Sequence, residues 1–106
     1  MYKMVTLPKI LKFEWDKGNL AKSYAGHGIT PREAEEIFVD EELYVLPDIK
    51  HSGSEERYIG LGRTQEGRKL FVVFTLRKEN IRIISVRRMH KKEVSKYEKV
   101  KKGPSV

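Results

Sequence analysis

Residues 57–88 read RYIGLGRTQEGRKLFVVFTLRKENIRIISVRR and contain three strand patterns in close succession. The first residues alternate between two faces, the segment 70–76 is nearly continuously apolar, and residues 81–86 alternate again. Residues 65–67 and 78–80 are polar and are typical of hairpin turns. The pattern predicts a three-stranded antiparallel meander whose middle strand is central in the sheet and buried on both faces.

Upstream of this meander the sequence predicts one strand and two helices. Residues 9–15 alternate in the manner of a short strand, and residues 17–26 have apolar side chains at helical spacing before a glycine pair. Thr30 and Glu33 form a capping box, in which each side chain accepts a hydrogen bond from the other residue's backbone N–H. A second helix is therefore predicted over residues 31–38.

The remaining segments complete the predicted fold. Residues 43–47 indicate an edge strand, because Pro47 has no N–H to donate to a neighbour. Residues 91–101 predict a third helix that directs Val94 and Tyr97 inward. Two helices, a strand meander and a final helix indicate an α+β domain with an antiparallel sheet.

The positive charge of the protein is concentrated at one end of the sequence. The chain has 22 Lys and Arg residues against 15 Asp and Glu residues, a net charge of +7. Residues 1–81 hold 13 residues of each sign, whereas residues 82–106 hold nine basic and two acidic residues, so 9 − 2 = +7. We expect this basic end to bind a polyanion or an acidic partner, or only to face solvent.

Length and composition exclude several classes of protein. A chain of 106 residues predicts a single domain, with residues 1–9 as a peripheral leader and residues 99–106 as a peripheral tail. The absence of cysteine excludes disulfide scaffolds, Cys-ligated metals and thiol nucleophiles. No apolar run is long enough for a signal peptide or a membrane span, so we expect a cytoplasmic protein.

The candidate chemistry does not point to a metal. His27, His51 and His90 are not spaced as metal ligands, so no metal or other cofactor is expected. The segment 51–57 combines an imidazole, two carboxylates and a guanidinium group, as loop active sites do. Taken alone, this spacing favours an ordinary polar loop whose charges pair with one another.

Several arginines lie on the predicted strands or at their ends. Arg82 alternates with Ile81 and Ile83, so it must point to the sheet face opposite those apolar side chains. A charged side chain on a sheet usually only faces solvent. Arginines that converge on one face would instead bind phosphate oxygens, because each planar guanidinium group offers paired donors.

Three segments of the chain carry distinctive motifs, namely FEWDKGNLAKSYAGHGITPREAEEIF (13–38), LPDIKHSGSEERYIGLGRT (46–64) and RIISVRRMHKKEVSKYE (82–98). In this order they resemble the BrnT toxin family. The resemblance spans about residues 11–98, and Gly26 stands where the family usually has a lysine. The positions that match the family pattern are Trp15, Asp16, Lys22, His27, His51, Glu55, Glu56, Arg57, Arg63, Arg82, Arg87, Glu93 and Tyr97.

The resemblance implies a RelE-like fold and a ribonuclease toxin of a type II toxin–antitoxin pair that cuts RNA without metal. Such a toxin needs a general base for the attacking 2′-hydroxyl and positive charge on the reacting phosphate. We assign transition-state stabilisation to Arg63, Arg82 and Arg87, and the base to His51 or Glu56, with His51 favoured by its ordinary pKa. Substrate binding is assigned to Lys22, His27, Arg57, Arg88 and Tyr97.

The resemblance also implies partners. These are an RNA substrate and a cognate antitoxin, of the ribbon-helix-helix type, in a 2:2 hetero-oligomer that binds DNA only through the antitoxin. The alternative is a catalytically weak or inactive module of the same fold that binds RNA or an antitoxin. DNA binding by this chain alone has no support, because no helix-turn-helix or ribbon pattern is present.

Overall fold

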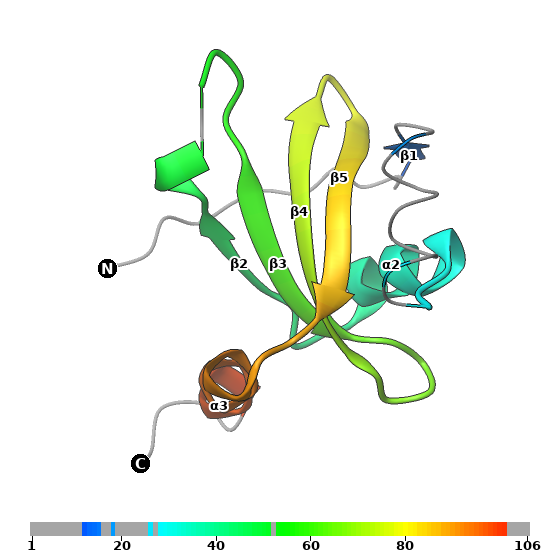
Figure 1. Cartoon of the computed structure of the whole chain (residues 1–106), viewed down its shortest axis with the longest axis vertical. Coiled ribbons are helices and arrows are strands. Elements are labelled where there is room, and N and C mark those ends of the chain that lie inside the picture. Colours follow the sequence, from blue (N-terminus) through cyan, green and yellow to red (C-terminus); the bar gives the residue numbers. More distant parts are fainter. Residues whose placement is uncertain (1–11, 16–17, 19–25, 27, 52, 102–106) are drawn as a thin grey trace.

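The computed structural model describes residues 12–15, 18, 26, 28–51 and 53–101, except for the side chains of residues 51, 100 and 101. One sheet is flanked by short helices, and α3 lies beside its lower end in the view of Figure 1. In chain order the elements are β1 (Lys12–Trp15), α2 (Pro31–Glu36), the 3₁₀ helix η1 (Ile37–Val39), β2 (Tyr44–Pro47), the 3₁₀ helix η2 (Ile49–His51), β3 (Tyr58–Arg63), β4 (Lys69–Arg77), β5 (Asn80–Arg88) and α3 (Lys91–Lys101).

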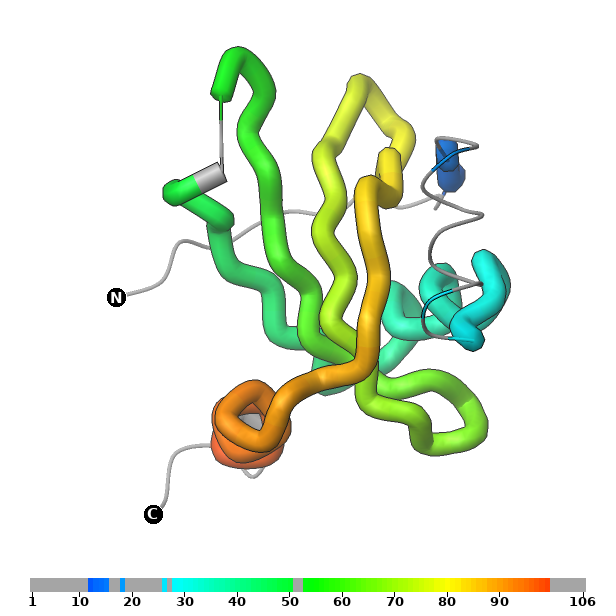
Figure 2. The backbone as a smooth tube through the Cα atoms, in the orientation of Figure 1, coloured from blue at the N-terminus to red at the C-terminus, as the bar shows by residue number. Residues whose placement is uncertain are grey.

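The sheet has five strands in the order β1-β5-β4-β3-β2. The tube in Figure 2 follows the predicted meander of β3, β4 and β5, which pair antiparallel, and β2 is an edge strand as predicted. β1 pairs with β5 in parallel, with Trp15 opposite Ile83. The prediction of an antiparallel sheet is therefore wrong, and the sheet is mixed. The parallel pair joins strands far apart in the chain, which no local hairpin pattern reveals.

The register between β4 and β5 shifts once. Val73 pairs with Ser85 and Phe74 pairs with Ile83, so Ile84 is an extra residue in β5 and forms a β-bulge. In a regular strand, residues 82 and 87 would point to opposite faces, because side chains alternate. The bulge reverses that alternation and brings Arg82 and Arg87 to the same face.

The main core lies on the face of the sheet that α2 and η1 cover. Leu70, Val72 and Phe74 of β4 are fully buried there, and Phe38 stacks edge-on against Phe74 at 5.0 Å between ring centroids. A Cβ atom added at Gly62 would lie 2.7 Å from the Cβ of Ile37. Glycine at this position therefore lets β3 approach η1 closely.

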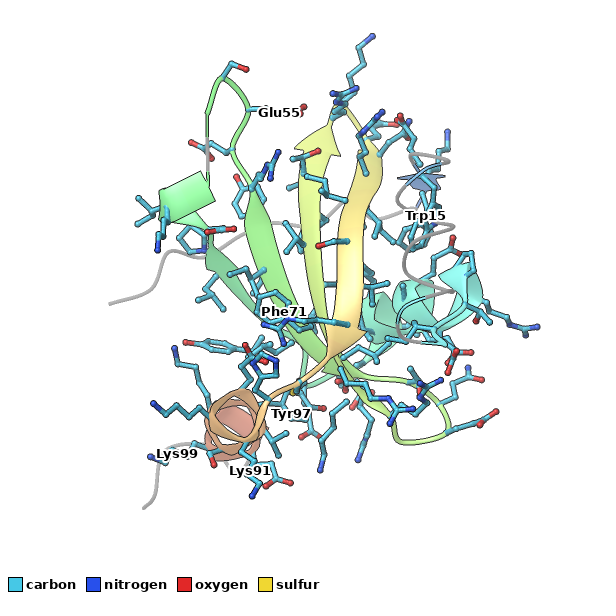
Figure 3. The ribbon with its side chains drawn as sticks, in the orientation of Figure 1. Trp15, Glu55, Phe71, Lys91, Tyr97 and Lys99 are labelled. Atoms are coloured by element: carbon cyan, nitrogen blue, oxygen red, sulfur yellow. The ribbon has the colours of Figure 1, made fainter. Side chains whose placement is uncertain are left out.

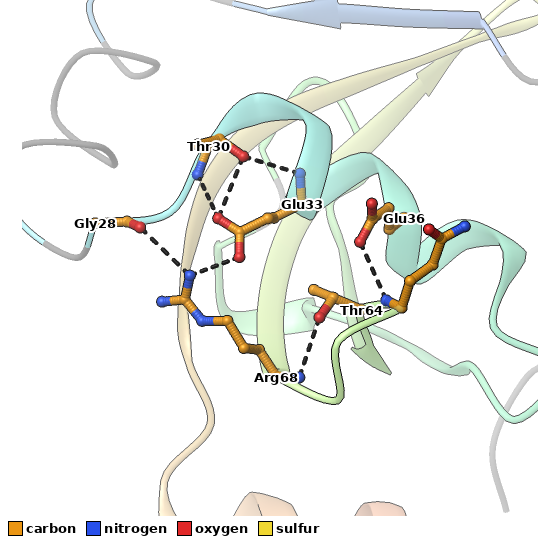
Figure 4. Close-up of polar contacts among 7 residues, drawn as sticks. Gly28, Thr30, Glu33, Glu36, Thr64 and Arg68 are labelled. Atoms are coloured by element: carbon orange, nitrogen blue, oxygen red, sulfur yellow. Dashed lines mark hydrogen bonds and ion pairs between the residues drawn. The ribbon is translucent and has the colours of Figure 1, made fainter.

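The capping box predicted at the start of α2 is confirmed. The N–H of Glu33 donates to the Thr30 hydroxyl at 3.2 Å, and the N–H of Thr30 donates to the Glu33 carboxylate at 3.0 Å. Figure 4 shows that Arg68, from the β3–β4 loop, donates to the same carboxylate and to the carbonyl of Gly28. The Thr30 and Arg68 hydrogen bonds lower the pKa of Glu33, and they fix α2 to the sheet.

The opposite face of β4 is only partly covered. Phe71 and Val73 are half-buried, so the prediction that this strand is buried on both faces is wrong. α3 contacts β3, and Leu61 and Tyr97 are buried apart from the main core cluster. One short helix therefore covers one end of this face, a result that an apolar run by itself does not reveal.

Two predictions about helices differ in outcome. The helix predicted over residues 91–101 is confirmed as α3, with Tyr97 fully buried and Val94 half-buried. The helix predicted over residues 17–26 lies largely outside the described residues, so the RelE-like arrangement with two N-terminal helices stays a prediction.

Candidate functional site

The partly covered face of the sheet carries the predicted arginines, and we call it the arginine face. It is the face opposite α2, and the paired positions of β4 and β5 define it. Charged side chains occupy its two ends, and uncharged side chains lie between them. Its β4 and β5 residues are Lys69, Phe71, Val73, Thr75, Arg77, Asn80, Arg82, Ser85 and Arg87.

The lower end of the arginine face holds Arg87 in a fixed position. Both terminal nitrogens of its guanidinium group donate to Glu93, each at 2.8 Å. The group also lies 3.7 Å from the ring centroid of Phe71, a cation–π contact. Glu93 further accepts the N–H of His90 at 2.7 Å, and its pKa is lowered chiefly by the Arg87 hydrogen bonds. The start of α3 thus positions Arg87.

The upper end of the arginine face holds a second group of arginines. Arg82 lies 3.7 Å from the carboxylate of Glu14 on β1. Arg77, at the end of β4, donates two hydrogen bonds to Glu55, at 2.7 and 3.2 Å. Figure 3 shows Glu55 at the upper end of the sheet, far from Tyr97 at the lower end. Thr75 and Phe71, the partners of Arg82 and Arg87, are about 13 Å apart at the usual rise of a strand.

Arg63 belongs to the lower end of the same face, because β3 pairs Leu61 with Phe71 and Arg63 with Lys69. Its backbone N–H donates to Asp40 at 3.0 Å, and the residue also lines an open cleft of about 510 Å³. Most of the charged residues in this cleft are acidic, so its field repels RNA. The lining residues are Glu36, Val39, Asp40, Glu41, Glu42, Arg63, Thr64, Gln65, Glu66 and Gly67.

Comparison with known proteins identifies the family. The model of the family described as "Ribonuclease toxin, BrnT, of type II toxin-antitoxin system" matches residues 15–93, about three quarters of the chain. The chain belongs to the BrnT family. The match runs from β1 to the first turn of α3 and so contains the arginine face.

A solved structure supports the fold. The 1.1 Å crystal structure of the Brucella abortus ribonuclease toxin BrnT is similar to this chain with a TM-score of 0.58 and 20% sequence identity. The similarity covers 77% of this chain and 100% of the Brucella chain. None of the curated proteins matches the chain. At this identity the likeness shows the fold, and the site must be argued from the residues themselves.

The structure gives Tyr97 of this BrnT chain a packing position. The side chain is fully buried, and its hydroxyl donates to Asp40 at 2.6 Å. Burial and the neighbouring carboxylate both raise the pKa of Tyr97, so the hydroxyl keeps its proton. The side chain is inaccessible to solvent in this structure, and the predicted role of Tyr97 in substrate binding stays a prediction.

Glu56 is the one candidate general base whose side chain the structure describes. Its carboxylate accepts a hydrogen bond from the Tyr58 hydroxyl at 2.7 Å, and this contact raises the pKa of Tyr58. Glu56 precedes β3 in the loop at the upper end of the sheet, the same end as Arg82. The side chains of His51, Lys22 and His27 lie outside the described part of the chain, so their predicted roles stay predictions.

The arginines predicted to bind substrate are placed by their strands. Arg57 directly precedes β3, and its side chain is half-buried. Arg88 ends β5 opposite Leu70 and is exposed, on the other side of the sheet from Arg87. Arg57 therefore extends the arginine face, whereas Arg88 does not.

Three features of the arginine face were not predicted from the sequence. Phe71 was assigned to a buried strand, although it supports Arg87. The pair of Glu55 and Arg77 joins residues 22 positions apart, and no local pattern reveals such a contact. Thr75 lies between arginines only because of the sheet register. The bulge did leave a signal, since Ile81, Ile83 and Val86 are all buried and a regular strand cannot bury all three on one face.

Two further observations concern ligands and membranes. Within the described part of the chain, no group of three or more His, Cys, Asp or Glu side chains is arranged to hold a metal ion. None of the described helices is long and apolar enough to cross a membrane.

Proposed function

We propose that this BrnT chain is an endoribonuclease that cleaves single-stranded RNA on its arginine face and needs no metal ion. The observation that carries this proposal is the bulge at Ile84, which turns Arg82 and Arg87 to the same partly covered face. Bulges are frequent next to active sites, where they re-aim a side chain. Two guanidinium groups about 13 Å apart on one face suit a chain with repeated phosphate groups.

The reaction requires only groups that a protein can supply. The RNA 2′-hydroxyl loses its proton to a general base and attacks the adjacent phosphorus, forming a P–O bond. The P–O bond to the 5′-oxygen breaks, and that oxygen takes a proton from a general acid. The products are a 2′,3′-cyclic phosphate and a 5′-hydroxyl. Negative charge accumulates on the phosphoryl oxygens in the transition state, so guanidinium groups stabilise the transition state more than the bound substrate.

We assign this charge stabilisation to Arg82, which lies at the same end of the sheet as the proposed base, and the binding of a neighbouring phosphate to Arg87. Arg87 is the better preorganised of the two, because Glu93 and Phe71 both hold its guanidinium group. Preorganised donors contribute about 10²–10³ in rate each. Arg63 lies in a mainly acidic cleft, so we propose a smaller, indirect contribution for it.

The general base is proposed to come from the loop before β3. Glu56 and His51 both belong to that end of the sheet, and Arg57 would bind a neighbouring phosphate there. Lys22 and His27 keep their proposed roles in substrate binding. A positioned base contributes about 10²–10⁴ in rate.

The family also implies an antitoxin, and we propose that it is acidic and of the ribbon-helix-helix type. Exposed lysines of α3, namely Lys91, Lys92, Lys96 and Lys99, form a basic surface beside the arginine face. An acidic antitoxin bound there would compete with RNA for the same charge, and paired copies of each chain would form a 2:2 complex.

The direct test is RNA cleavage by the purified protein in excess chelator. We expect cleavage that chelator does not reduce, with cyclic phosphate ends. Arg82→Gln should lower the cleavage rate about 10²-fold or more, and Arg87→Gln should lower it less, through weaker binding of RNA. Arg32→Gln is the matched control, because that side chain is 89% exposed on α2, away from the arginine face. Equal rates for all three variants would refute the assignment.

A second candidate function follows from the pairing of the arginines. Arg77 and Arg87 each place two donors on a carboxylate, so these groups are engaged in the free protein. A module that binds RNA or an antitoxin without cleavage is consistent with such pairing. Stable RNA binding without new RNA ends, in the same assay, would favour it over the nuclease.

A further inference from the structure

The carboxylate of Glu55, at the upper end of the arginine face, is paired with one arginine and experiences the charge of two more. Glu55 accepts two hydrogen bonds from Arg77, at 2.7 and 3.2 Å. These bonds are the main reason that the pKa of Glu55 is lowered, and the positive charges of Arg82 and Arg57 lower it further. Glu55 belongs to the loop between η2 and β3, and its side chain is 39% exposed.

A buried hydroxyl group lies on the sheet between two of these arginines. Thr75 is 1% exposed, and its Oγ1 has no hydrogen-bond partner among the described residues. It pairs directly with Arg82 on β5. On its other side, Tyr58 pairs with Phe74, so Arg57 lies at the next register position, opposite Thr75. Arg57, Thr75 and Arg82 therefore form a row across the strands.

This arrangement has the chemistry of an anion site. Guanidinium groups bind the oxygens of carboxylates and phosphates with the same paired donors. A buried hydroxyl without a partner is costly to the fold, and such groups are typical of sites that a ligand completes. An oxygen of a bound anion can accept the Thr75 proton, since phosphate oxygens are acceptors only. The carboxylate of Glu55 accepts hydrogen bonds from Arg77 and not from the Thr75 hydroxyl, which has no partner among the described residues.

We propose that Arg57, Thr75, Arg77 and Arg82 bind one phosphodiester group of single-stranded RNA, and that Glu55 occupies this site until RNA displaces it. The RNA identity of the ligand rests on the function proposed above, and the anion site rests on the contacts just described. Because Glu55 is on a loop, its side chain can leave the arginines without movement of a strand. Glu55 thus competes with anions for the arginines, and an anion that binds them only weakly does not displace it.

The test is binding of a short 2′-O-methyl RNA, which carries the phosphates of RNA but lacks the attacking hydroxyl. Affinity is measured by fluorescence anisotropy at fixed ionic strength for the full chain and its variants. We expect Glu55→Gln to bind about threefold to tenfold more tightly than the parent, because the competing charge is gone. Glu79→Gln is the matched control, since it removes one exposed negative charge from the neighbouring β4–β5 turn.

A second substitution tests the hydroxyl. Thr75→Val keeps the shape of the side chain and removes the unpaired oxygen, so the midpoint of urea unfolding should not fall. Its affinity for the probe should nevertheless fall at least about threefold when it is combined with Glu55→Gln. An unchanged affinity in this combination would exclude Thr75 from the site.

The outcomes separate this proposal from the nuclease function. If Glu55→Gln binds the probe no more tightly than Glu79→Gln, the anion site is refuted, even if the parent cleaves RNA. If the parent does not cleave natural RNA but Glu55→Gln tightens probe binding relative to Glu79→Gln, the site is supported and the nuclease is refuted. Weaker binding by Glu55→Gln than by the parent would show that Glu55 organises the arginines rather than competing for them.

Discussion

Substitution of Tyr97 by phenylalanine separates a packing role from a substrate role. The Tyr97 hydroxyl is buried and donates to Asp40 at 2.6 Å, and the same carboxylate oxygen accepts the N–H of Arg63 at 3.0 Å. This pair joins α3 to the segment between η1 and β2. Removing the hydroxyl leaves the ring in place, so the change tests one hydrogen bond.

The expected effect is a loss of stability without a loss of specific activity. A hydrogen bond to a charged acceptor contributes about 1.5–3 kcal/mol to the free energy of unfolding. For a domain of this size, about 2 kcal/mol lowers Tm by about 10 °C. Urea unfolding followed by circular dichroism measures the change. The m value should not change, because the same surface is exposed on unfolding.

Tyr58→Phe is the matched control for this substitution. The Tyr58 hydroxyl also donates to a carboxylate, that of Glu56 at 2.7 Å, but this hydrogen bond is exposed. Its loss should cost less than about 1 kcal/mol. The reasoning is refuted if Tyr97→Phe is as stable as the parent. It is also refuted if RNA cleavage falls about tenfold or more while stability is unchanged, because the hydroxyl would then act on substrate.

Three other perturbations test separate parts of the structure. Replacing Lys92 and Lys96 by glutamine should reduce the slope of log affinity for RNA against log salt by about 1.4, because each phosphate contact contributes about 0.7, and a salt titration measures this slope. The pKa of Glu93 is lowered in the folded protein, so the ionised carboxylate stabilises the fold above pH 4.5, and this stabilisation is lost as the pH falls through the folded pKa. Urea midpoints measured from pH 5 downwards should therefore fall more steeply for the parent than for Glu93→Gln. Gly62→Ala sets a Cβ 2.7 Å from a core isoleucine and should lower the free energy of unfolding by about 1–3 kcal/mol, whereas Gly53→Ala, with open space around it, should change it little.

The parts of the fold that the sequence predicted are those that local physics specifies. The capping box at Thr30 needs only two residues three positions apart, and it forms as expected. The meander follows from alternation and from turn residues at 65–67 and 78–80. The parallel pairing of β1 with β5 was not predicted, because the two strands are far apart in the sequence and no local pattern links them.

The candidate site was predictable as a set of residue types and only partly as an arrangement. The sequence indicated that arginines matter, but it treated Arg63, Arg82 and Arg87 as one convergent group. The structure places Arg82 at one end of the arginine face and Arg87 at the other, with Arg63 at the Arg87 end beside an acidic cleft, and only the strand register reveals these positions. Tyr97 shows the same limit, since an aromatic residue at helical spacing fits both a core and a site until its burial is known.

Pairing of arginines with carboxylates determines which parts of the surface carry the net charge of +7. Arg82, Arg77 and Arg87 each lie beside a carboxylate, from Glu14, Glu55 and Glu93 respectively, so the arginine face is nearly balanced in the free protein. The basic excess is carried by the exposed lysines of α3, which attract RNA over the range of the Debye length, about 10 Å. Partly exposed ion pairs contribute at most about 1 kcal/mol, so under the proposed function the phosphates of RNA attracted by these lysines can replace the carboxylates one at a time. The proposed attraction and the proposed chemistry then reside on different elements, and the proposed acidic antitoxin could cover α3 and block the first without contacting the second.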